Sequence, residues 1–280
     1  MNLVLFSILV FLLVFAFGYL PFIRKIASGP HVLGRMTALA GGFLIGAALL
    51  IALPEGFEVY LHATEGGELS GRSGWMQPAF IAGLAVLGGF LMMLILEGFG
   101  FGHDVHEEHH DHSHEHGHQH VNHPEGSAKM LVVGLSMHAL MDGFAIGAAY
   151  ALGELALSLQ LALVILMHKF PAAFSLSAYS LHERHDKKRS MTDLLLFAAA
   201  TPLAILLSAT MFAAVDQSYI GLMLLFSAGT FIYVATVDVL PNIHIQEKSR
   251  ETLWLVLGGI TAMVVLSALI GMLVPEGHIH

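Results

Sequence analysis

The chain has 280 residues, of which 56% are hydrophobic and 12% charged, about half the charged share of an ordinary soluble domain, so a soluble fold is excluded. It has no cysteine, which excludes disulfides and thiolate metal sites, and its formal charge of −9 argues against nucleic acid and for cationic partners. The 19 histidines outnumber the 12 lysines and arginines. A metal site would therefore use His, Asp, Glu, Met or backbone oxygen.

Eight apolar segments are long enough to cross a bilayer, which takes about 20 residues of helix. In chain order they are 2–20, 32–53, 79–97, 128–151, 156–181, 191–214, 218–240 and 252–274. The first is interpreted as a retained membrane helix, because it lacks a basic start and a cleavage site and is followed by Arg24 and Lys25. We therefore predict an all-α integral membrane protein with eight transmembrane helices, forming a single transmembrane domain over residues 1–280.

The basic residues of the short connections indicate the orientation of these helices. Ten of the 12 lie in connections on one side of the predicted membrane, and only Arg72 lies on the other. The remaining one, Lys169, lies inside a span. This asymmetry predicts that both termini are outside and that the 98–127 connection is cytoplasmic.

Acidic residues gather after the second span. The stretch 54–78 is predicted to be a connection, and it contains the acids Glu55, Glu58, Glu65 and Glu68. Glu55 follows Pro54 at the outer end of the span. Acidic residues at an entrance concentrate cations. The alternative is an ordinary solvated loop.

The 98–127 connection is rich in histidine and is predicted to be disordered. It contains His103, His106, His109, His110, His112, His114, His116, His118, His120 and His123. This composition is suited to metal binding, and the alternative is a merely soluble linker. Whether the loop would sense, buffer or receive metal stays open. Just before it, Glu97 ends the third span and is equally open to a pathway role or a structural one.

Ionisable residues inside the fourth and fifth spans are functional hypotheses by default, because burying them in lipid is costly. His138 and Asp142 are four residues apart and share one helix face. At about 1.5 Å per residue, His138 lies roughly 15 Å into its span and His168 roughly 18 Å into the next. Antiparallel neighbours would bring the three side chains together near the midplane. Two imidazoles and one carboxylate suit zinc, and the alternative is a buried polar network without metal.

Lys169 follows His168 and needs compensation, because a buried lysine costs at least about 2.5–3.5 kcal/mol. Asp142 is the nearest carboxylate by depth, and Asp238 is a second candidate. Asp238 lies toward the cytoplasmic end of the seventh span and near His244. These two residues are predicted to belong to an exit path, unless Asp238 only balances charge.

At these residues the sequence resembles the ZIP family of zinc and iron transporters, and within it the ZIP-nine branch. The resemblance is carried by IALPEG at 51–56, HALMDGFAIGAA at 138–149, MHKFPAAF at 167–174 and LFSAGTFIYVATVDVLP at 225–241. It covers nearly the whole chain and implies a ZIP-like bundle with metal motifs on the fourth and fifth spans. It also implies zinc or a related divalent cation as the transported substrate, moved toward the cytoplasm, with no prosthetic group.

The sequence departs from the pattern of many family members, which hold two adjacent metals. Those members place an Asn after the His of the fourth span, and acids after the His and the Pro of the fifth. Ala139, Lys169 and Ala172 stand at these positions here. The second site is therefore expected to be lost, and we hypothesise that Lys169 stands in for its cation.

The resulting prediction is a divalent metal transporter that is not an enzyme. Two alternatives are a metal sensor or receptor without flux and an intramembrane zinc hydrolase whose site activates water. Expected partners are divalent metal ions and the lipid bilayer, with no nucleic acid and with a homodimer left open. The predicted location is the plasma (inner) membrane of a bacterium, or the Golgi or plasma membrane of a eukaryote. The choice among zinc, iron, manganese and cadmium stays open.

Overall fold

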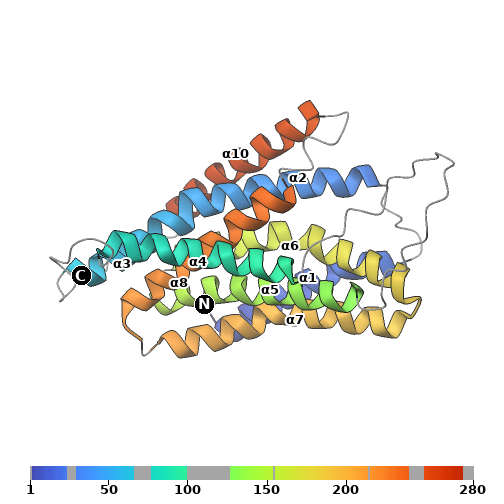
Figure 1. Cartoon of the computed structure of the whole chain (residues 1–280), viewed down its shortest axis with the longest axis horizontal. Coiled ribbons are helices and arrows are strands. Elements are labelled where there is room, and N and C mark those ends of the chain that lie inside the picture. Colours follow the sequence, from blue (N-terminus) through green and yellow to red (C-terminus); the bar gives the residue numbers. More distant parts are fainter. Residues whose placement is uncertain are drawn as a thin grey trace.

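The computed structural model describes residues 2–23, 30–65, 77–99, 127–153, 155–213, 215–239 and 249–273. Its long helices run roughly side by side (Figure 1). They are α1 Leu3–Tyr19, α2 Pro30–Ala47, α3 Leu53–Glu65, α4 Pro78–Gly98, α5 Ser127–Ala151, α6 Leu155–Arg184, α7 Lys187–Phe212, α8 Gln217–Tyr233 and α10 Ser249–Leu273. Within the described ranges, eight helical stretches are long and apolar enough to cross a membrane, which confirms the predicted fold class.

The second span is longer than predicted, because helix continues through Pro54 to Glu65. A π-helical segment, Ala48–Ala52, joins α2 to α3, and the Leu53 N–H bonds to the carbonyl of Ala48. In a regular α-helix the Pro54 ring would clash with the carbonyl four residues earlier, and the wider turn relieves that clash. The expectation of a connection starting at residue 54 is therefore wrong. Glu55, Glu58 and Glu65 are helical, and Glu68 lies outside the described residues.

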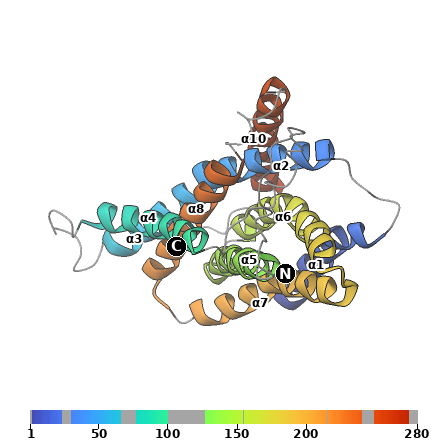
Figure 2. The same cartoon turned by 45° about the vertical axis from the view of Figure 1, so that its right-hand side comes forward.

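The helices pack in two groups (Figures 1 and 2). In one group α1, α5, α6 and α7 pack against one another. In the other, α8 packs against α3 and α4, while α2 packs against α10. Contacts of α2 with α6 and of α5 with α8 join the two groups. The helices that carry the predicted site, α5 and α6, belong to the same group.

Helix α5 lies very close to α7. A Cβ atom at Gly143 would collide with the carbonyl oxygen of Thr201, so this approach requires glycine. The Thr201 hydroxyl donates a hydrogen bond to the carbonyl of Ala139, at 2.8 Å. Small residues and such hydroxyl bonds are typical of helix contacts in membranes. Together they fix against α7 the turn of α5 that carries His138 and Asp142.

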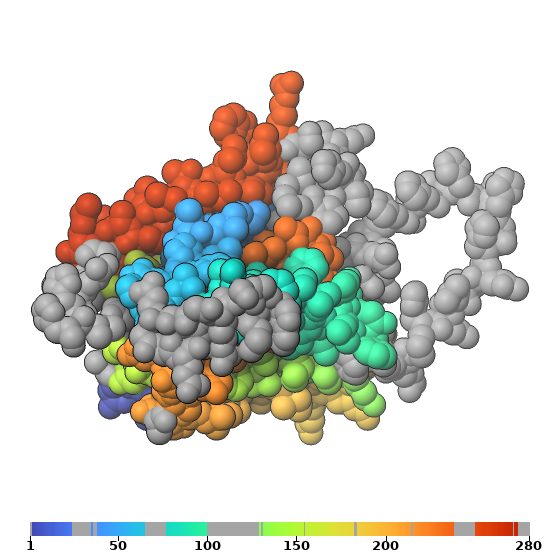
Figure 3. Space-filling model, turned by 60° about the vertical axis from the view of Figure 1, so that its left-hand side comes forward, coloured from blue at the N-terminus to red at the C-terminus, as the bar shows by residue number. Residues whose placement is uncertain are grey.

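Helix α10 lies at one edge of the molecule beside α2, as the space-filling view shows (Figure 3). Its outer face exposes large apolar side chains, including Trp254, which is 70% exposed, Leu257 and Val265. A face of this kind is costly in water and favourable in lipid. The outer surface of α10 thus has the apolar character expected of a helix that faces lipid.

Candidate metal centre

Three side chains from α5 and α6 converge near the middle of the two helices. His138 and His168 bring their Nε2 atoms within 3.3 Å of each other. Asp142 Oδ2 lies 3.3 Å from the Nε2 of His168 and 3.5 Å from that of His138. All three residues are at least nine-tenths buried. The His138–Asp142 contact follows from their four-residue spacing, and the third side chain comes from the antiparallel neighbour.

The three separations fit the edges of a tetrahedron around one zinc ion. With zinc–ligand bonds of about 2.0–2.1 Å, two ligands at a tetrahedral angle lie about 3.3–3.4 Å apart. The ligand atoms of the cluster are 3.3, 3.3 and 3.5 Å apart. Such a set fills three corners and leaves the fourth for water or another ligand. The cluster has the donor types and the spacing to hold a zinc ion with three protein ligands.

The orientation of the His168 ring is set by the main chain. Its Nδ1–H donates a hydrogen bond to the carbonyl of Val164, one helical turn earlier, at 3.1 Å. This bond places the proton on Nδ1 and leaves the lone pair of Nε2 pointing at the cluster. The ring of Phe231, on α8, packs edge-on against His168, with centroids 6.1 Å apart. Metal-ligating histidines usually donate their other ring N–H to a carbonyl or carboxylate, as His168 does here.

Lys169 is also part of this cluster. Its Nζ lies 2.8 Å from Asp142 Oδ2, the oxygen that faces both imidazoles. The lysine side chain is 1% exposed, so the ion pair has almost no access to solvent. Nζ also lies 5.0 Å from the centroid of the Phe197 ring on α7. The pairing expected between Lys169 and Asp142 is thus present.

Of the remaining predicted site residues, only Glu55 has a described side chain, and it is not in the group of ligand atoms. Glu55 is half-buried on α3. Asp238 lies in the π-helical segment Val234–Val239, and its side chain is outside the description. His244 and the ten histidines of the 98–127 loop, from His103 to His123, are outside the described residues. Their roles in a metal pathway stay predictions.

Two polar contacts between helices were not predicted from the sequence. Asp193 of α7 accepts a hydrogen bond from Ser180 at 2.6 Å and pairs with Arg184 Nε at 2.6 Å. Near the end of α4, Glu97 accepts a hydrogen bond from the hydroxyl of Tyr233 on α8. An acid inside the sixth span was the available signal for Asp193. Both contacts tie helices together.

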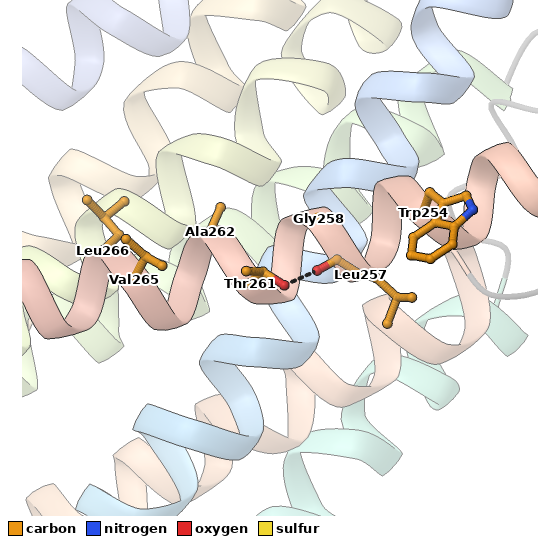
Figure 4. A pocket seen from close by; sticks show the side chains of 7 residues that line it. All are labelled: Trp254, Leu257, Gly258, Thr261, Ala262, Val265 and Leu266. Atoms are coloured by element: carbon orange, nitrogen blue, oxygen red, sulfur yellow. Dashed lines mark hydrogen bonds between the residues drawn. The ribbon is translucent and has the colours of Figure 1, made fainter.

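The surface of α10 also carries a shallow groove, whose lining includes Trp254, Thr261 and Leu266 (Figure 4). The lining is mostly apolar, and the hydroxyl of Thr261 donates to the carbonyl of Leu257 in its own helix. The groove offers neither imidazole nor carboxylate.

Comparison with known proteins points the same way as the cluster. A family model described as ZIP Zinc transporter matches residues 102–267. The protein named Zinc transporter ZIP9 from Micropogonias undulatus is 29% identical over 282 residues, and the one from Xenopus tropicalis is 30% identical over 280, each covering 88% of both chains. Zinc transporter ZIP1 from Danio rerio is 28% identical over 311 residues, covering 92% of this chain and 93% of its own. The matched range includes all three residues of the cluster.

Proposed function

The chain belongs to the ZIP zinc transporter family, and from that premise we propose that it carries Zn²⁺ toward the cytoplasm through a site formed by His138, Asp142 and His168. The observation that supports this site most directly is the buried triangle of ligand atoms at zinc-like separations. The relatives are transporters rather than enzymes, which sets aside the intramembrane hydrolase. The family resemblance predicted from the sequence is confirmed, as is a multi-pass membrane protein.

The proposed mechanism exchanges water ligands of Zn²⁺ for protein ligands. A transported ion must bind well enough to lose hydration yet weakly enough to leave. Three protein ligands with a fourth corner open meet both conditions. The imidazole of His168 is held ready by its bond to Val164, so little reorganisation is needed when the ion arrives. Zinc would enter past Glu55 and leave past Asp238 and His244 toward the His-rich loop.

The inward direction rests on the family and on the distribution of basic residues. Lysine and arginine gather in the connections on the side of the 98–127 loop, which predicts that this loop faces the cytoplasm. Release toward a segment with ten histidines gives the ion an acceptor on that side. Zinc uptake measured separately in right-side-out and inside-out membrane vesicles tests the direction. Equal or reversed uptake under the same gradient contradicts it.

The site itself is tested with purified protein in liposomes that contain a zinc-sensitive dye. His138→Ala, Asp142→Ala and His168→Ala are each expected to lower the uptake rate at least about tenfold, because each removes one ligand. His62→Ala is the matched control, since His62 is exposed on α3. Normal uptake in all three site variants would refute the assignment. Zinc binding without any flux in the parent protein would instead favour a sensor or receptor.

A further inference from the structure

One carboxylate oxygen, Asp142 Oδ2, belongs both to the proposed zinc site and to the ion pair with Lys169. Asp142 Oδ2 is the corner shared by both imidazole contacts, at 3.3 and 3.5 Å, and it also binds the ammonium of Lys169 at 2.8 Å. A zinc ion within the triangle would take this oxygen as a ligand. With a zinc–oxygen bond of about 2.0–2.2 Å, the ion would sit no more than about 5 Å from the ammonium. The two cations cannot both keep full contact with Oδ2 without strong repulsion in a site that excludes solvent.

The surroundings of Lys169 offer a second position for its ammonium. The Phe197 ring lies 5.0 Å from Nζ, inside the roughly 6 Å range of cation–π attraction. One turn away on α7, the carboxylate of Asp193 is already paired with Arg184 and bonded to Ser180. The ring is therefore the available partner on that helix. Because Nζ already lies within this range, an ammonium displaced from the carboxylate would still have the ring face as a partner.

We propose that Lys169 is a tethered cation that competes with Zn²⁺ for Asp142 Oδ2 and moves onto the Phe197 ring when zinc binds. Lys169 then sets the affinity of the site for Zn²⁺. As the ion leaves, the ammonium pairs with the Asp142 carboxylate again and neutralises its charge. The inference rests on the proposed zinc site and adds to it a residue pair that controls affinity and release.

A double-mutant cycle at one fixed pH tests the proposal, with Zn²⁺ binding to the purified protein measured by equilibrium dialysis. Lys169→Met removes the competing charge and is expected to tighten zinc binding about 100-fold or more. Phe197→Leu removes the second position and is expected to weaken binding about tenfold. In the double variant, the Phe197 substitution should have no further effect, because no ammonium remains to be displaced.

Matched controls separate this effect from general changes in charge or packing. Lys129→Met removes one positive charge from an exposed position at the start of α5, and Phe43→Leu removes a buried ring on α2. Neither should change zinc affinity by more than about twofold, since Lys129 is exposed and Phe43 lies on a helix that carries no predicted ligand. Lys169→Gln, which also removes the positive charge, replaces Lys169→Met if the latter does not fold.

His168→Ala separates failure of the inference from failure of the proposed site. If His168→Ala leaves zinc binding intact, the site itself is wrong. If His168→Ala abolishes binding while Lys169→Met and Lys169→Gln bind zinc as the parent does, the ion and the lysine use different oxygens and the competition is refuted. An effect of Phe197→Leu that persists without Lys169 would show ordinary packing and would overturn the second position.

Discussion

Replacing Asp142 by Asn should separate two roles of this carboxylate. Its negative charge stabilises the fold by pairing with Lys169, and its oxygen is a proposed zinc ligand. Asp142 and Lys169 are 2.8 Å apart and 0% and 1% exposed. Removing one partner of a buried pair leaves an uncompensated charge, so Asp142→Asn should lower the free energy of unfolding by about 3–5 kcal/mol. Replacing both partners removes the stranded charge. The double variant with Lys169→Met should therefore recover most of that loss.

Zinc binding should follow a different pattern. The double variant lacks the ligand carboxylate, so it should stay unable to hold zinc even where its stability returns. Unfolding would be followed by SDS titration of the purified protein, and zinc binding by equilibrium dialysis of the same samples. A stable Asp142→Asn single variant would refute the buried pair. Zinc affinity restored in the double variant would refute Asp142 as a ligand.

Three further outcomes are expected. Lys169→Glu exchanges a cation for an anion and should raise the bound zinc from one ion to two per chain, as measured by elemental analysis. A single bound ion would contradict the idea that Lys169 stands in for a second metal. Deleting residues 103–123 should retain transport but change its dependence on cytoplasmic zinc, and loss of inserted protein would count against it. Gly143→Ala should lower the free energy of unfolding by about 1–3 kcal/mol, because it forces α5 away from α7. Gly83→Ala is the control and should be nearly neutral, since a Cβ there would have no neighbour within 4 Å. Equal unfolding free energies of the two variants would contradict the close contact.

Much of the fold follows from the sequence, because lipid leaves few choices. Backbone N–H and C=O groups find no water in lipid, so they must bond to one another, and apolar spans form helices. The number of these helices can be counted from hydropathy. The second span shows the limit of that reasoning. Its outer part, from Pro54 to Glu65, carries acids and a proline, so it resembles a connection, yet the helix continues past the apolar stretch. Hydropathy marks where a helix enters lipid and does not mark where the helix ends.

Some parts of the candidate site could also be predicted from the sequence, and others could not. His138 and Asp142 could be paired from their spacing on one helix, and His168 could be added because a short connection predicts antiparallel neighbours. Phe197 could not be found, because its position beside Lys169 depends on how α6 packs against α7. The link from His168 to Val164 was also hidden, since a carbonyl acceptor leaves no trace in residue type.

The bond from His168 to the carbonyl of Val164 also couples metal affinity to helix integrity. Because the acceptor belongs to the main chain, side-chain substitutions at position 164 leave it in place. The imidazole is oriented only while the turn between these residues remains wound. If zinc binds the oriented ring more tightly than a free one, zinc binding stabilises the wound turn by that difference in binding free energy. The backbone amides of residues 164–168 would then exchange their hydrogens with solvent more slowly when zinc is bound, so occupancy of the site would be visible in the main chain without any label on the metal.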